Sequence, residues 1–211
     1  MSSRTEITRL REKASTERAE VDALLDSTHV GHFALSTDDG PVVIPTAVVR
    51  DGDRVLAHGS TGSRWMRLLA AGAPTCLAIT AVDGVVVARS AFESSFHYRS
   101  AVLFGRCTAL DDTAKLAALD VVTEALIPGR VAELRHPTDK ELGATLVLAM
   151  PIAEWSLKIS AGWPDDPAED VAGNAWAGVI PMSTAYGLPV GAPDLRPGIP
   201  VPRSVRAFPG Q

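Results

Sequence analysis

Residues 30–58 read VGHFALSTDDGPVVIPTAVVRDGDRVLAH, a run of strand-like segments separated by two turns. The first turn holds Asp39-Gly40 and the second holds Asp51-Gly52. Asp-Gly between β-branched residues is typical of tight hairpin turns, because glycine adopts a positive φ angle without strain. The stretch therefore predicts an antiparallel meander of three strands.

Further strands and a few helices are expected on both sides of this meander. Before it, Val21, Leu24 and Leu25 repeat at helical spacing, which predicts a helix that ends near Ser27. The other expected elements are helices over 64–71 and 111–127, a hairpin of 75–82 and 85–89 with its turn at Asp83-Gly84, and strands over 100–110, 146–150 and 154–160. Because short helices only interrupt the strands, the predicted fold class is mainly β, an antiparallel closed or split β-barrel.

Length and composition exclude several classes of protein. The chain has 211 residues, 46% hydrophobic and 21% charged, which fits one globular domain with extensions. The net charge of −5 argues against nucleic acid as a partner. Cys76 and Cys107 lie in apolar runs, so neither a disulfide framework nor a cysteine-rich metal site is predicted. No apolar stretch reaches membrane-span length and no signal sequence is recognised, so we expect a cytoplasmic protein with no membrane partner.

Proline divides the chain into a body and an arm. Seven of the 15 prolines fall within residues 181–211. We therefore expect a domain over 1–182 and a Pro-rich C-terminal arm over 183–211 that forms neither a helix nor a central strand. Apolar residues between the prolines favour an ordered arm over a disordered end.

Two segments carry candidate anion-binding residues. Residues 58–64, HGSTGSR, join a strand to a helix, and their small and hydroxyl-bearing side chains suit a phosphate, although an ordinary capping loop has the same composition. Residues 89–100, RSAFESSFHYRS, offer arginines for a phosphate and aromatic rings for a flat ligand. The alternative for this second segment is a surface loop with ion-paired arginines.

Other polar and aromatic residues receive structural interpretations. The acidic stretch 165–170 is expected to serve solubility, and Trp155, Trp163 and Trp176 are expected to pack in a core or an interface. Histidines, cysteines and carboxylates lack metal-ligand spacing, so no metal site is predicted.

Four segments taken together resemble the pyridoxamine 5′-phosphate oxidase-like flavin-nucleotide-binding proteins. They are residues 43–46, 58–64, 83–92 and 98–105, and the resemblance extends from about Arg18 to Pro181. Within that family the sequence looks closest to the branch of the nitroimidazole-resistance reductases. The resemblance implies a split β-barrel, a homodimer, and FMN bound across the subunit interface.

The resemblance also assigns residues to the cofactor. They are Ile44, Pro45, Thr46 and Ala47 along the flavin ring, His58, Gly59 and Ser60 at the ring and ribityl chain, Ser63 and Arg64 at the phosphate, and Tyr98, Arg99 and Ser100 on the other side. His58 is the candidate catalytic residue, because an imidazole near the flavin can bind a substrate or pass a proton. The sequence departs from the family pattern at Ser160, where an arginine is frequent, and at His97.

The function implied is that of an FMN-dependent oxidoreductase, which reduces a small organic acceptor with electrons from a nicotinamide cofactor. Two alternatives stay open. One is a deazaflavin-dependent reductase on the same fold, and the other is a non-catalytic flavin- or haem-binding protein with His97 or His58 as axial ligand. In a dimer, we expect the arm from about Tyr186 to Phe208 to lie over the partner subunit.

Overall fold

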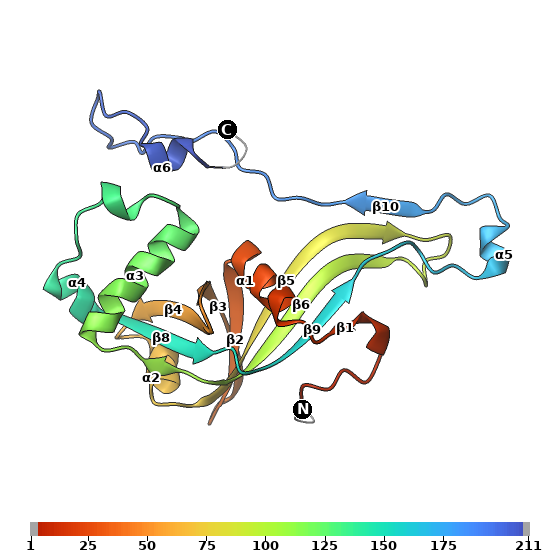
Figure 1. The fold of residues 1–211 in the computed structure, drawn as a ribbon, viewed down its shortest axis with the longest axis horizontal. Coiled ribbons are helices and arrows are strands. Elements are labelled where there is room, and N and C mark those ends of the chain that lie inside the picture. Colours follow the sequence, from red (N-terminus) through yellow and green to blue (C-terminus); the bar gives the residue numbers. More distant parts are fainter. Residues whose placement is uncertain (1–3, 209–211) are drawn as a thin grey trace. The chain divides into compact units, whose positions relative to one another are not determined.

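The computed structural model describes residues 4–208, which form two compact units. Unit 1 contains the chain up to Thr46 together with 74–105 and 152–183, and unit 2 contains 47–73, 106–151 and the chain from Thr184 onward. The elements in chain order are η1 Arg11–Lys13, β1 Ala14–Ser15, α1 Arg18–Ser27, β2 Val30–Thr37, β3 Gly40–Asp51, β4 Arg54–Ser60, α2 Arg64–Ala70, β5 Pro74–Val87, β6 Ser95–Arg106, β7 Thr108–Ala109, α3 Asp112–Leu126, η2 Val131–Glu133, α4 Asp139–Ala144, β8 Thr145–Pro151, β9 Glu154–Ser160, α5 Ala168–Val171, β10 Gly178–Pro181 and α6 Arg203–Arg206 (Figure 1).

Unit 1 is an antiparallel sheet in the order β1-β9-β6-β5-β2, and β10 adds to β5. The strands β5 and β6 are long and run side by side with β9, as Figure 1 shows. Helix α1 packs on β5, and its apolar face is buried through Val21, Leu24 and Leu25. Phe33 and Leu103 complete this core from β2 and β6.

Unit 2 is built on β4, which pairs with the end of β3 on one side and with β8 on the other. Helix α3 packs on β4 and β8. The core between them includes Val49, Leu56, Ala118, Val122 and Val147.

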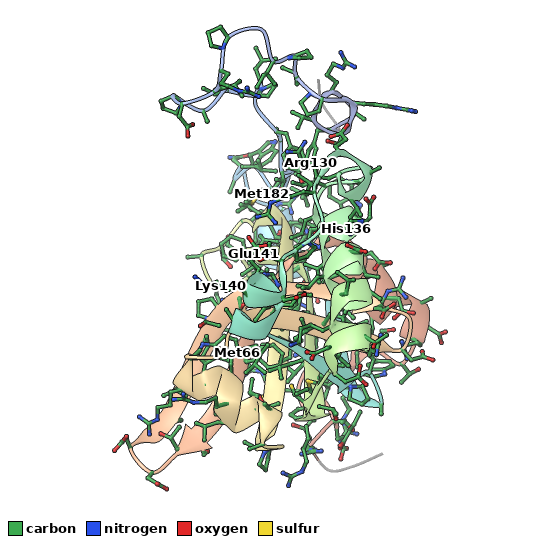
Figure 2. All side chains as sticks on the ribbon, turned by 90° about the vertical axis from the view of Figure 1, so that its left-hand side faces the viewer. Met66, Arg130, His136, Lys140, Glu141 and Met182 are labelled. Carbon is green, nitrogen blue, oxygen red and sulfur yellow. The ribbon has the colours of Figure 1, made fainter. Side chains whose placement is uncertain are left out.

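Helix α4 has a capping box that fixes its first turn. The Glu141 N–H donates to the Thr138 hydroxyl, and the Thr138 N–H donates to the Glu141 carboxylate at 2.7 Å. The Arg135 guanidinium, followed by the N–H and hydroxyl of Thr138, lowers the pKa of Glu141 to about 2 by donating to its carboxylate. Figure 2 shows Lys140 and Glu141 on α4, beside α3.

The structure confirms the predicted class, mainly β with short helices, and the predicted meander. Strands β2, β3 and β4 follow one another, and the turn glycines Gly40 and Gly52 have φ angles of 108° and 59°. The helices predicted over 64–71 and 111–127 are α2 and α3.

The predicted hairpin turn at Asp83-Gly84 is wrong. Strand β5 runs straight through both residues, and Gly84 pairs with Pro181 of β10. Gly84 is needed for a close approach rather than for a turn, since a Cβ there would lie 3.0 Å from the carbonyl oxygen of Ile180. The Asp83 carbonyl accepts a hydrogen bond from the Met182 N–H at 3.0 Å.

The segment 89–100 is also less loop-like than expected. Strand β6 begins at Ser95, so the connection from β5 spans only 88–94. The Arg89 backbone N–H and guanidinium both donate to the Asp166 carboxylate, each at 2.8 Å. The Asp166 side chain is fully buried, so the solubility interpretation of the acidic stretch is wrong at this residue.

The C-terminal arm leaves β10 and ends in a short helix, α6, which the proline pattern did not predict. Near that end, the Tyr186 and Phe208 rings meet edge to face with centroids 4.7 Å apart. Pro202 precedes the helix as its N-cap, a position where a missing N–H costs nothing. The division into a domain and an arm stays a prediction.

Candidate functional site

The residues that the resemblance assigns to a cofactor fall into two groups, one in each unit. Those in unit 1 are Ile44, Pro45, Thr46, Tyr98, Arg99 and Ser100, and those in unit 2 are Ala47, His58, Gly59, Ser60, Ser63 and Arg64. Each group is described within its own unit.

Strand β3 carries the assigned run 44–47. Pro45 is exposed, whereas Ile44, Thr46 and Ala47 are half-buried. A proline lacks the N–H that a central strand needs, so its place on an exposed face is expected. The strand thus presents a mainly apolar surface without charged side chains at this point.

The strand-to-helix connection after β4 is closed by its own hydrogen bonds. The Gly62 N–H donates to the Ser60 hydroxyl oxygen at 3.1 Å, and the Ser63 N–H donates to the Ser60 carbonyl at 3.0 Å. The Thr61 N–H and hydroxyl both donate to the carbonyl of Ala144 at the end of α4. Because the Ser60 oxygen acts as an acceptor here, its own proton is available to a ligand.

Gly59 lies in a tightly packed position within unit 2. A Cβ at this position would lie 3.1 Å from the Met66 Cγ and 3.3 Å from its Sδ. Met66 is fully buried in α2, on the side of the unit shown in Figure 2. This contact explains the glycine without any ligand.

Two histidines have a buried ring nitrogen without a hydrogen-bond partner among the described residues. They are the Nδ1 atoms of His58 on β4 and of His29 in the link between α1 and β2. A buried polar atom without a partner costs about 1–3 kcal/mol, so such an atom marks a position where a ligand, a metal or a proton acceptor fits.

Arg99 forms a bidentate ion pair with Asp83 on the neighbouring strand β5. The Arg99 Nε and Nη2 atoms donate to the two carboxylate oxygens, each at 2.9 Å, and Nη1 donates to the Ser27 hydroxyl at 3.3 Å. The pair lowers the pKa of Asp83 and raises that of Arg99. The guanidinium therefore holds strands β5 and β6 together, and a phosphate would have to compete with a bidentate carboxylate.

Tyr98 and Ser100 flank this arginine on β6 and are half-buried. Tyr98 pairs with Ser160 of β9, and the Ser100 hydroxyl shares a hydrogen bond with that of Thr80 at 2.9 Å. The His97 Nε2 atom contacts the Gly162 carbonyl at 2.7 Å, which occupies one of its two ring nitrogens.

Sequence reasoning missed two features of this region. The sequence pattern predicts a turn at Asp83 and does not indicate its pairing with Arg99, sixteen positions away. The spacing of His29 in the sequence predicts no metal site, and its buried Nδ1 atom becomes visible only in the fold. Among the described residues, no group of three or more histidines, cysteines and carboxylates could hold a metal ion. Within the same part of the chain, no helix is long and apolar enough to cross a membrane.

The chain is similar to one family of known proteins over most of its length. The family model described as pyridoxamine 5′-phosphate oxidase matches residues 17–159. No curated protein matches the chain.

Two solved structures are similar over nearly the whole chain. The FAD and haem binding protein from Mycobacterium smegmatis is 54% identical, with a TM-score of 0.91, over 94% of this chain and 98% of that one. The flavocytochrome Anf3 from Azotobacter vinelandii is 36% identical, with a TM-score of 0.93, over 100% of this chain and 98% of that one. These matches confirm the predicted split β-barrel fold.

A third structure bears on the narrower resemblance. A candidate 5-nitroimidazole antibiotic resistance protein from Bacteroides thetaiotaomicron is 15% identical, with a TM-score of 0.59, over 69% of this chain and 86% of that one. This likeness extends to the fold alone.

Proposed function

The chain belongs to the pyridoxamine 5′-phosphate oxidase family, and from that premise we propose that it binds a flavin and a haem and passes electrons between them. The observation that carries the proposal is the 54% identity to a FAD and haem binding protein over 94% of the chain. The similarity to a flavocytochrome over the full chain adds to it. A flavin exchanges one or two electrons and a haem exchanges one, so together they can divide an electron pair into single steps.

This proposal favours the flavin- and haem-binding alternative over the FMN-dependent reductase. The likeness to a nitroimidazole resistance protein is at 15% identity, too low to carry a substrate. We propose FAD rather than FMN as the flavin, because FAD is the flavin named for the 54% identical relative.

The residues of this chain offer partners for both ends of a flavin. Within unit 2, the apolar Ala47 suits the flat ring, and Ser60 has a hydroxyl proton available for the ribityl chain or a phosphate. Arg64 is exposed at the first position of α2, where a guanidinium can meet a phosphate. Arg99 contributes indirectly, by holding β5 to β6 through Asp83.

A bound haem would need a side chain to hold its iron, and the histidines with unpartnered ring nitrogens could supply one. A neutral imidazole is a common haem ligand, and His58 and His29 each have a buried Nδ1 atom without a partner among the described residues. Cys107 is unsuitable, since burial raises the pKa of its thiol to about 12 and keeps it protonated. We infer that His58 is the first candidate and His29 the second.

The visible spectrum of the purified full-length protein tests the proposal. We expect flavin absorption together with a Soret band after desalting, and release of FAD rather than FMN on denaturation. Addition of NADH or NADPH should bleach the flavin and then shift the Soret band if a nicotinamide is the donor. A colourless protein that takes up only a deazaflavin, or a flavin spectrum without haem after haem supplementation, would overturn it.

Histidine variants test the axial ligand separately. We expect His58→Ala to abolish or shift the Soret band while the circular dichroism of the protein stays unchanged. His29→Ala and His97→Ala complete the series, and the exposed His32 provides the matched control His32→Ala. An unchanged Soret band in His58→Ala would exclude His58, and an unchanged band in every variant would exclude each of the four histidines tested as an indispensable ligand.

A homodimer is the second part of the proposal. Phe92, Trp163 and Trp176 in unit 1 are 91%, 81% and 67% exposed, and large aromatic side chains in water mark interaction surfaces. The prediction that Trp163 and Trp176 pack in a core is wrong. We propose that a second copy of the chain buries them. Light scattering should then give the mass of a dimer, and Trp163→Ser should shift it toward the monomer. A monomeric wild-type protein would contradict this.

A further inference from the structure

The N-terminal segment over residues 4–15, here called the strap, contacts strand β9 at both of its ends. At one end the Arg4 guanidinium pairs with the Glu154 carboxylate, with Nε at 2.9 Å from Oε1. At the other end β1 pairs with β9, and the Lys13 Nζ donates to the Ser160 hydroxyl at 3.2 Å. The strap therefore has a fixed position over β9 in unit 1.

A cavity of about 410 Å³ lies between the strap and β9. Its volume falls within the usual range of small-molecule sites, about 300–1,000 Å³. The apolar part of its lining includes Ile7 from the strap and Trp155 and Leu157 from β9. None of the residues assigned to the flavin or the haem lines it, so the cavity is a separate site.

Two charged side chains of opposite sign line the same cavity. The Arg11 Nη2 atom lies 3.3 Å from the Glu6 Oε1 atom, and the two side chains are 70% and 56% exposed. An exposed pair with a single long contact contributes little, about 0–1 kcal/mol, so both partners can turn to a ligand at small cost. The third charged residue of the lining, Glu154, is already paired with Arg4.

We propose that this cavity binds an α-amino acid with a large apolar side chain. The ligand carboxylate pairs with Arg11, its ammonium group pairs with Glu6, and its side chain packs on Trp155 and Leu157. A simple anion or cation would pair with only one of the two side chains. A zwitterion forms two ion pairs in place of one, and the apolar lining selects against small or polar side chains.

Ligand analogues test the chemistry in the full-length protein. Saturation-transfer NMR should show that L-phenylalanine binds at least tenfold more tightly than phenylacetate, which lacks the ammonium group, and than phenethylamine, which lacks the carboxylate. Glycine should not bind. Equal binding of the three aromatic compounds would refute the ion-pair arrangement. No binding of L-phenylalanine, as expected if a second copy of the chain covered the cavity, would overturn the proposal.

Charge variants test the residues. Arg11→Glu should weaken L-phenylalanine binding at least tenfold, whereas Arg9→Glu, the same charge change on a strap residue outside the cavity lining, should not. The double variant Glu6→Arg/Arg11→Glu should restore binding but prefer D-phenylalanine, because exchanging the two charged groups about a fixed side chain inverts the configuration. An equal loss in Arg9→Glu, or a double variant that fails to bind either enantiomer while its circular dichroism is unchanged, would refute the assignment. The flavin and Soret bands should be unaffected throughout, so this test is independent of the proposed function.

Discussion

Ser204 donates two hydrogen bonds to the carboxylate of Glu133, from its backbone N–H at 3.1 Å and from its hydroxyl at 2.6 Å. The Arg130 guanidinium pairs with the same carboxylate, with its Nη1 atom 3.0 Å from the Glu133 Oε2 atom. Ser204 is buried by this contact, which attaches α6 to η2 within unit 2. One carboxylate thus anchors α6 to η2.

The attachment of α6 should depend on pH. The Ser204 donors, followed by Arg130, lower the pKa of Glu133. A carboxyl group with a lowered pKa stabilises the fold above its unfolded value, about 4.3, and that contribution is lost as the pH falls through the folded value. We therefore expect amide exchange of α6, corrected for intrinsic rates, to stay constant near neutral pH and to accelerate in acid.

The variant Glu133→Gln should give fast α6 exchange at every pH, because it removes one charged acceptor. Glu169→Gln on α5 is the control and should leave α6 unchanged. Slow α6 exchange in Glu133→Gln would contradict the role of the carboxylate.

Arg64→Ala should weaken retention of the flavin. A charge-assisted hydrogen bond contributes about 1.5–3 kcal/mol, which corresponds to roughly tenfold to a hundredfold in the dissociation constant. Arg67→Ala removes the same charge one turn later on the exposed face of α2 and is the control. Fluorescence titration of the apoprotein with FAD measures both, and equal losses would show that Arg64 has no specific contact.

Gly84→Ala should detach β10 from β5. The new Cβ would lie 3.0 Å from the Ile180 carbonyl oxygen, a backbone atom that cannot move alone. We expect a loss of about 1–3 kcal/mol in the free energy of unfolding, measured by urea denaturation. Gly143 on α4 has open space at its Cβ position, so Gly143→Ala should be stabilising by about 0.5–1 kcal/mol. An unchanged free energy of unfolding in Gly84→Ala would mean that β10 does not lie close to β5 at this position.

Asp166→Ala should loosen the connection between β9 and β10. It removes both acceptor oxygens of Arg89, whose charged hydrogen bonds contribute about 1.5–3 kcal/mol. The neighbouring Asp165 is exposed, and Asp165→Ala should have no effect. Urea denaturation compares the two variants, and similar stabilities would refute a structural role for Asp166.

Cys107 should resist thiol reagents in the folded protein. Burial raises the pKa of its thiol to about 12, so the reactive thiolate is scarce up to about pH 10. Mass spectrometry after maleimide treatment should find Cys107 unlabelled, and labelled once the protein is unfolded in urea. Cys76 is less buried and serves as the internal comparison. Rapid native labelling of Cys107 would contradict its burial.

The parts of the fold predicted from sequence are those with local causes. The turns at Gly40 and Gly52 follow from the positive φ of each glycine, and α3 begins where the Asp111 side chain accepts from the Ala114 N–H. Asp83-Gly84 is the same Asp-Gly dipeptide as in those turns. Its conformation, however, is determined by its pairing with β10, which lies almost 100 residues later in the chain. A local pattern cannot contain that information.

In the candidate site, too, the features with local causes are predicted from the sequence and the tertiary contacts are not. The composition of residues 58–64 predicts a strand-to-helix connection, and in the structure these residues lead from the end of β4 into the start of α2. The pairing of Arg99 with Asp83 depends on how β5 lies beside β6, and the buried ring nitrogen of His58 depends on packing in unit 2. These contacts are tertiary, so the sequence could name the residues but not their partners.

The arm between Tyr186 and α6 should tolerate a change in its length. Both of its ends make contacts within unit 2, while Leu188 and Val190 between them are 83% and 93% exposed. Doubling the length of a flexible loop costs only about 0.6 kcal/mol, so this span can accept insertions without disturbing either end. A reporter domain inserted after Val190 should leave the rest of the protein folded, whereas one inserted between Glu133 and α4 should not.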